Sequence, residues 1–229
     1  MYDDFSPSMK KADLKLRIDQ YVNELSEDGF ELHPISSSKK NIAQSVWGKA
    51  WVKSLIQFDY YGLRLAPGRS LLRQGCVIDL KVEEGCVRAK IVAHELLDIT
   101  LRVAPLCEEK QQDLQDLCSK SADSWISLVK GDIPENLLIS LCDKDSGLFP
   151  LPDEWNAICP CDDWADVCSH AAAVLYALGV WLDGHPDSLF VLRGIDPRTL
   201  IPNVEKMDEP QSCAEDDADW ESIFQCNLS

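Results

Sequence analysis

Apolar residues recur at helical spacing in the first part of the chain. Within residues 9–28 the apolar side chains fall three and four positions apart, and Asp28-Gly29 closes the segment, so the pattern predicts an amphipathic packing helix. These side chains are Ile18, Tyr21, Val22 and Leu25. A second helix is predicted after the linker at 36–40, because Trp47, Trp51 and Leu55 recur at i, i+4 and i+8. Two tryptophans on one face are typical of a core, and a binding surface is the alternative.

The middle of the chain alternates between apolar and polar residues. Residues 77–82 and 87–92 both alternate, and Glu84-Gly85 between them supplies a two-residue turn, which predicts a β-hairpin. The predicted register pairs Val82 with Val87, Leu80 with Ala89, Ile78 with Ile91 and Asp79 with Lys90. It also sets Cys76 opposite Ala93 and Cys86 opposite Glu83, which argues against a disulfide between these cysteines.

Further elements complete the expected fold. Ile99, Leu101 and Val103 indicate a third antiparallel strand, and residues 108–141 are expected to be helical, with Pro134 at a helix start. Residues 155–158 indicate a short strand, and a helix is expected from Cys168 onward. The fold class predicted is therefore α+β: a small antiparallel β-meander with flanking helices and a strand-turn-helix unit.

That last unit carries the most informative motif of the chain. Cys159-Pro160-Cys161 is followed, after six residues, by Cys168-Ser169-His170. Three thiolates and one imidazole complete a tetrahedral zinc shell, so these four side chains are the predicted metal ligands. Because protein would fill every coordination position, the single zinc is expected to be structural, and loss of a ligand is expected to unfold the unit. The alternative is a set of small buried cysteines.

The same string resembles the SWIM zinc finger, although its C-x-C spacing departs from the commoner C-x2-C pattern of zinc sites. Segments 47–51, 67–70 and 192–194 also look like stretches shared by bacterial SWIM-containing proteins, so the resemblance covers roughly residues 41–200. It implies zinc binding, a role in contacting DNA or protein, and association with a Swi/Snf-type helicase. It implies no enzymatic activity for the finger.

Length and composition bound the protein class. With 229 residues, 45% of them hydrophobic, the chain can bury one substantial core or two small ones. It lacks both an apolar run of about 20 residues and a basic, apolar leader, so a cytoplasmic location without membrane association is expected. Outside the motif, the other seven of the ten cysteines are expected to be free thiols. The predicted regions are 1–35 (helical), 41–143 (α+β with the meander), 144–203 (zinc finger and following helices) and 204–229 (acidic tail).

Charge is distributed unevenly. Residues 39–73 hold seven Lys and Arg residues against the single acid Asp59, a local balance of +6. This region is the candidate phosphate-binding surface, and a solvated face with ordinary cations is the alternative. The candidate nucleic-acid contacts are Lys49, Lys53, Arg64, Arg69 and Arg73.

The predicted finger has the opposite charge. No Lys or Arg lies between Lys144 and Arg193, whereas eight Asp and Glu residues do, and a zinc ion with three thiolates would add a further negative charge. Such a surface repels DNA, because phosphate neutralisation supplies most non-specific DNA affinity. A protein partner fits better, with Trp164, Tyr176 or Trp181 either contacting it or belonging to the core.

The last 25 residues are strongly acidic and are predicted to form a disordered tail. Trp220, Ile223 and Phe224 would form an apolar stripe if the segment became helical on binding, so they are a candidate partner-docking motif. The alternatives are that the stripe folds back onto its own domain or has no specific role.

No catalytic constellation stands out. The chain contains no phosphate-binding glycine loop and no hydrolase or metalloprotease signature, and nothing supports a thiol enzyme built on Cys76 or Cys142 with His94. A non-enzymatic, zinc-binding adaptor without a small-molecule substrate is therefore predicted. The alternatives are a DNA-binding accessory protein that uses region 39–73, and a zinc switch that oxidation of the ligand cysteines would trigger.

Overall fold

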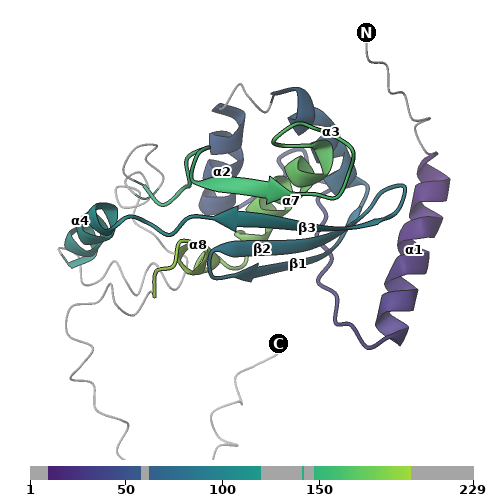
Figure 1. The fold of residues 1–229 in the computed structure, drawn as a ribbon, viewed down its shortest axis with the longest axis horizontal. Helices are drawn as coiled ribbons and strands as arrows, with labels where there is room; N and C mark the ends of the chain where they lie inside the picture. Colours follow the sequence, from purple (N-terminus) through teal and green to yellow (C-terminus); the bar gives the residue numbers. More distant parts are fainter. Residues whose placement is uncertain (1–9, 58–61, 120–140, 142–146, 197–229) are drawn as a thin grey trace, which may run out of the picture.

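The structure, a computed structural model, describes residues 10–57, 62–119, 141 and 147–196. It is an α+β fold in which four antiparallel strands and six helices are defined within those ranges (Figure 1). The strands are β1 Val77–Glu83, β2 Cys86–Val92, β3 Leu96–Val103 and β4 Trp155–Ile158. The helices are α1 Lys11–Glu27, α2 Val46–Gln57, α3 Gly62–Arg73, α4 Glu108–Ser119, α7 Ser169–Trp181 and α8 Ser188–Leu192. The predicted fold class, a small antiparallel meander with flanking helices, is confirmed.

The sheet has the order β1-β2-β3-β4. Val82 pairs with Val87 and Leu80 with Ala89, as the alternation predicts, and Gly85 supplies the turn with a φ of 63°. The fourth strand pairs with the third, so Val103 lies opposite Trp155 although 52 positions separate them in the sequence.

One end of the hairpin corrects the predicted register. A bulge lies between Val77 and Asp79, so Ile91 pairs with Val77 rather than with Ile78. The predicted pairing of Cys76 with Ala93 is also wrong, because the N–H of Val92 donates to the carbonyl oxygen of Cys76. A bulge adds one residue to a single strand, and two apolar residues in succession, Val77 and Ile78, leave the period-2 pattern unable to reveal it.

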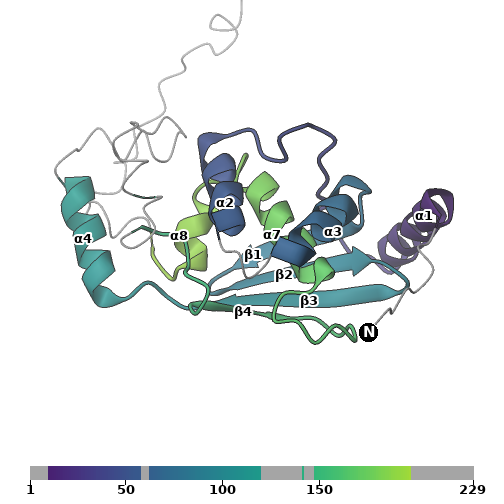
Figure 2. The ribbon, with the colours of Figure 1, turned by 90° about the horizontal axis from the view of Figure 1, so that it is seen from above.

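Helices α2, α3, α7 and α8 lie on one side of the sheet, and no described helix covers the other side (Figure 2). α7 occupies the middle of this layer, where nine consecutive residues from Ala171 to Gly179 are buried. The carboxylate of Asp183, just beyond α7, accepts hydrogen bonds of 2.8 Å from the N–H groups of Gln44 and Ser45, and this anchors the start of α2.

Small residues allow the helices to pack closely around α7. A Cβ atom at Gly68 of α3 would lie 2.5 Å from the Cβ of Ala172, and one at Gly48 of α2 would lie 2.3 Å from the carbonyl oxygen of Gly179. The local sequence does not predict α3, because Pro67 and Gly68 at its centre are typical of a turn. Packing against α7 stabilises the helix despite both residues.

A single hydrophobic cluster runs through the described part of the chain, from Leu14 in α1 to Ile195 after α8. The predicted core face of α2 is confirmed, since Trp47, Trp51 and Leu55 are all buried. The predicted N-terminal helix is likewise confirmed as α1, which contacts the β2–β3 turn through a hydrogen bond from Arg17 to the carbonyl oxygen of His94. Side chains of both predicted regions, 41–143 and 144–203, contribute to this cluster.

Two other expectations extend beyond the described residues, one in part and one entirely. α4 accounts for the start of the helical stretch expected over 108–141, whereas Pro134 lies outside them. The acidic tail, with Trp220, Ile223 and Phe224, also lies outside them. Among the described helices, none combines the length and the apolar character needed to cross a membrane.

Candidate metal centre

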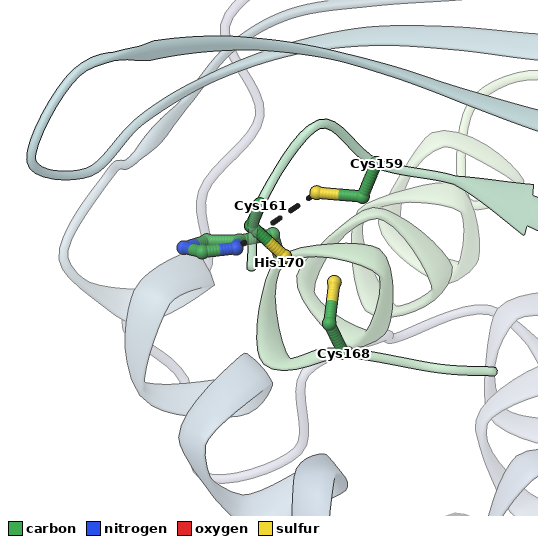
Figure 3. Close-up of side chains that lie close together, drawn as sticks. All are labelled: Cys159, Cys161, Cys168 and His170. Carbon is green, nitrogen blue, oxygen red and sulfur yellow. Dashed lines mark hydrogen bonds between the residues drawn. The ribbon is translucent and has the colours of Figure 1, made fainter. Parts of the chain in front are cut away.

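The predicted ligands come from two adjoining pieces of backbone (Figure 3). Cys159 and Cys161 follow β4, whose pairing with β3 fixes where that turn begins. Cys168 is the N-cap of α7, where its Sγ accepts a 3.3 Å hydrogen bond from the N–H of Ala171, and His170 lies in the first turn of that helix. A strand end and a helix start therefore bring the four side chains together, as the sequence predicts.

The four ligand atoms form one compact cluster. All lie within 4.8 Å of one another, and Cys159 Sγ is 3.9 Å from His170 Nδ1. In a tetrahedral zinc site with Zn–S near 2.3 Å and Zn–N near 2.0 Å, neighbouring ligand atoms are roughly 3.3–3.8 Å apart. A contraction of about 1 Å or less would close the cluster around an ion of that size. The donor set, three sulfurs and one imidazole nitrogen, fits a metal ion that prefers soft ligands.

The thiols of the cluster have unequal acidity. The pKa of Cys168 is lowered, first because it accepts a hydrogen bond from the Cys159 thiol and further because His170 and the N–H of Ala171 donate to it, against the opposing effect of burial. The pKa of Cys159 is raised by that same hydrogen bond and by burial, and burial also raises the pKa of Cys161. The hydrogen bonds at the start of α7 therefore stabilise one thiolate, that of Cys168, without a metal. Three thiolates together repel one another and need the charge of a bound cation.

The three aromatic residues considered for a partner surface differ in how far they are exposed to solvent. Tyr176 is fully buried in the core, and Trp181 is half-buried, stacks on His185 and donates to Ser188 Oγ at 2.9 Å. Trp164, between the two ligand pairs, is 99% exposed. It borders a shallow cavity of about 340 Å³ beside the cluster, whose lining includes the exposed Ile158. Of the three, Trp164 is the most accessible to a partner.

The five candidate nucleic-acid contacts do not form one continuous stripe. Lys49 and Lys53 on α2 and Arg69 on α3 line one cavity of about 540 Å³. Arg64 instead pairs with Asp163 at 3.0 Å, next to Trp164. Arg73 donates to the carbonyl oxygens of residues 39 and 40 at 3.4 and 3.1 Å.

Two polar residues have roles in the structure that the sequence pattern does not indicate. Lys40, counted there only as part of the basic region, joins Lys49, Lys53 and Arg69 in lining the cavity. Arg193 is fully buried, where it pairs with Glu154 at 3.0 Å and donates to the carbonyl oxygen of Ala104 at 2.8 Å. It joins the ends of β3 and β4 to α8, a long-range role that no local pattern reveals.

Comparison with known proteins finds an uncharacterized relative. The chain is 29% identical over 171 residues to the uncharacterized protein Rv2102 of Mycobacterium tuberculosis (strain ATCC 25618 / H37Rv). The match covers 73% of this chain and 61% of that protein, so the chain spans less than two thirds of its relative's length. No protein-family model and no solved structure matches the chain.

Proposed function

We propose that Cys159, Cys161, Cys168 and His170 bind one zinc ion and that the protein is a non-catalytic adaptor. The observation that carries this proposal is the convergence of all four ligand atoms to within 4.8 Å of one another. Four protein donors leave no coordination position for water or substrate, so the zinc has a structural role. It ties the end of β4 to the start of α7, and the binding energy of such sites, on the order of 10 kcal/mol, is comparable to the net stability of a domain.

The adaptor role is supported by the surface beside the cluster. A fully exposed tryptophan costs solubility and contributes nothing to the core, whereas tryptophan is enriched among residues that dominate the energy of protein interfaces. Trp164 sits in the loop whose ends the metal would fix, so zinc binding would hold it in a defined position. The resemblance of the ligand string to the SWIM finger makes a Swi/Snf-type helicase the proposed partner.

Elemental analysis of the purified, reduced protein tests the metal. We expect one zinc per chain in the wild type and in the control Cys107→Ser, because Cys107 is an exposed free thiol outside the cluster. Cys161→Ser, which removes a half-buried ligand, should lose most of the metal. A reduced wild type without zinc, or a Cys161→Ser variant that keeps a full equivalent, would overturn the proposal.

Binding to a purified Swi/Snf-type helicase tests the adaptor role separately. Trp164→Ala should weaken binding at least tenfold, the effect of about 1.4 kcal/mol, while its zinc content stays at one per chain. Leu16→Ala is the matched control, since Leu16 is also a large exposed apolar residue but lies on α1. Equal affinities of the wild type and Trp164→Ala would refute the role of Trp164 and leave the metal proposal standing.

A second candidate function is a nucleic-acid-binding accessory protein, because three of the five predicted cations, Lys49, Lys53 and Arg69, lie near one another on α2 and α3. If this function holds, replacing Lys49 and Lys53 by Gln should weaken DNA binding and reduce its dependence on salt. The same replacements should leave the affinity for a helicase nearly unchanged. A DNA affinity that is independent of both lysines would reject this candidate.

A further inference from the structure

The cavity of about 540 Å³ on the helical side of the molecule is a candidate ligand site separate from the metal cluster. Its lining comes from the segment before α2, from α2 itself and from α3. The volume lies in the range of roughly 300–1,000 Å³ that is typical of small-molecule sites. None of the residues that the metal proposal uses lines it.

Four cations line this cavity: Lys40, Lys49, Lys53 and Arg69. No Asp or Glu is among its described lining residues. Lys49 and Lys53 are one helical turn apart on α2, a spacing at which like charges repel and destabilise a helix. The rest of the chain is strongly acidic, with a net charge of −17 overall, so a general attraction for anions is not expected. A local concentration of positive charge in such a chain indicates a site for an anion.

Arg69 is held in place by α7. Its guanidinium lies 5.3 Å from the centre of the Tyr176 ring, and its Nη2 donates to the Tyr176 hydroxyl at 3.2 Å. Its Nε is buried and has no hydrogen-bond partner among the described residues. A buried donor without a partner is costly, and an oxyanion that reached the guanidinium would satisfy it. The orientation of Arg69 is therefore fixed before any ligand binds.

The remaining lining is largely apolar, and this narrows the class of ligand. Ile42, Val52 and Ile56 contribute to the wall, and Ile56 is 52% exposed in the free protein. A simple inorganic ion would leave this surface unused. A ligand with an anionic end and an apolar or aromatic body would cover it and gain the free energy of apolar burial.

We propose that this cavity binds a phosphorylated small molecule of the nucleoside phosphate class. The phosphates lie among Lys40, Lys49, Lys53 and Arg69, and the base or other apolar body lies against Ile42, Val52 and Ile56. Phosphate is preferred over carboxylate because several cations converge and each phosphate offers more charge and more acceptor oxygens. A duplex fits less well, because the cations surround a cavity instead of forming a stripe, and Arg64 and Arg73 are engaged elsewhere. This inference does not depend on the zinc proposal.

Isothermal titration calorimetry with three probes tests the inference: pyrophosphate, adenosine diphosphate and a 12-base-pair DNA duplex. We expect both phosphate compounds to bind, with the diphosphate nucleotide tighter. Lys49→Gln and Lys53→Gln should each weaken both by about tenfold, the effect of one charge-assisted hydrogen bond. Ile56→Ala should weaken binding of the nucleotide but not of pyrophosphate. These three side chains are exposed or partly exposed, so the fold should tolerate each change.

The control variant is Lys81→Gln, which removes the same charge from an exposed position on β1. It should bind both compounds with an affinity within about twofold of the wild type, and the zinc content of every variant should be unchanged. Absence of binding of both compounds at about 1 mM would overturn the inference. So would an equal loss in Lys81→Gln, or duplex binding through Lys49 and Lys53 in a protein that binds neither small compound. The last result would instead support the nucleic-acid function.

Discussion

The contact between α3 and α7 offers a sharp test of the packing that supports both candidate sites. The start of α7 carries the candidate metal ligands, Cys168 as its N-cap and His170 in its first turn, and α3 carries Arg69 of the basic cavity. The two helices are in close contact at Gly68. A Cβ atom there would lie 2.5 Å from the Cβ of Ala172 and under 3.0 Å from two atoms of the α7 backbone. Gly68→Ala therefore forces the two helices apart.

The size of the effect follows from two opposing terms. Overpacking a well-packed core costs roughly 1–3 kcal/mol, and the upper end applies because the nearest atoms, the Cβ of Ala172 and the α7 backbone, cannot rotate away. Replacing Gly by Ala inside a helix returns about 1 kcal/mol through higher helix propensity. We therefore expect Gly68→Ala to lower the free energy of unfolding by about 2 kcal/mol.

Urea unfolding followed by tryptophan fluorescence, with zinc present throughout, measures this difference. The matched control is Gly184→Ala, because a Cβ atom at residue 184 has nothing within 4 Å and the backbone there is not left-handed. That variant should stay within about 0.5 kcal/mol of the wild type. Adding Ala172→Gly to Gly68→Ala should recover part of the loss, so the two changes together cost less than their sum. A Gly68→Ala variant as stable as the wild type would refute the proposed close packing.

Four further predictions follow from the buried polar groups and the metal cluster. Arg193→Met should cost about 3 kcal/mol in urea unfolding, because it leaves the carboxylate of Glu154 without its buried partner. Partial burial acts to raise the pKa of Glu154. The hydrogen bond from the Leu151 N–H and the ion pair with Arg193 outweigh this effect, so the pKa is lowered below its usual 4.5. The stability difference between wild type and Arg193→Met should therefore be constant above pH 5 and shrink as the pH falls through the folded-state pKa; a difference that grows on acidification would contradict this. Burial raises the pKa of Cys76 to about 11, so iodoacetamide at pH 8 should modify exposed Cys107 first and Cys76 only after unfolding, as mass spectrometry would show. Chelation of the metal should remove hydrogen-exchange protection from residues 159–168 but leave most of α7 protected, because the buried run of α7 is held by core packing; this differs from the sequence-based expectation that the whole strand-turn-helix unit unfolds. Simultaneous loss of protection along α7 would refute the role of core packing.

Sequence reasoning succeeds where the determining pattern is local. The apolar period of α2 and the alternation around the Glu84-Gly85 turn predict elements that the structure contains. The predicted convergence of the four donor side chains is also found, because all four fall within twelve residues and one strand-turn-helix unit brings them together. Local patterns are enough when the partners are neighbours in sequence.

Sequence reasoning fails where an element depends on distant partners. α3 is missed because Pro67 and Gly68 disfavour a helix locally, whereas the fit of Gly68 against Ala172 is a tertiary contact. The bulge in β1 is invisible because two successive apolar residues satisfy either register. The lining of the basic cavity comes from three segments, which a local pattern does not bring together. Counting charges along the sequence also overestimates the number of cations available to a ligand, since Arg64 and Arg73 already have protein partners.

The composition of α7 explains why both candidate sites depend on one helix. Its run of Ala and Gly is not needed for helix propensity alone, since any straight-chain residue would serve on an exposed face. In this fold α7 lies between the sheet and helices α2 and α3. A larger side chain at Ala172 would press on Gly68, and a Cβ atom at Gly179 would lie 3.0 Å from side-chain atoms of Trp51 and Val52 on α2. Close packing on both sides fixes the helix along its length, so Cys168 and His170 at its start and Tyr176 at its middle have defined positions. The small residues therefore position the candidate metal ligands Cys168 and His170 directly, and they position Arg69 through its contact with Tyr176.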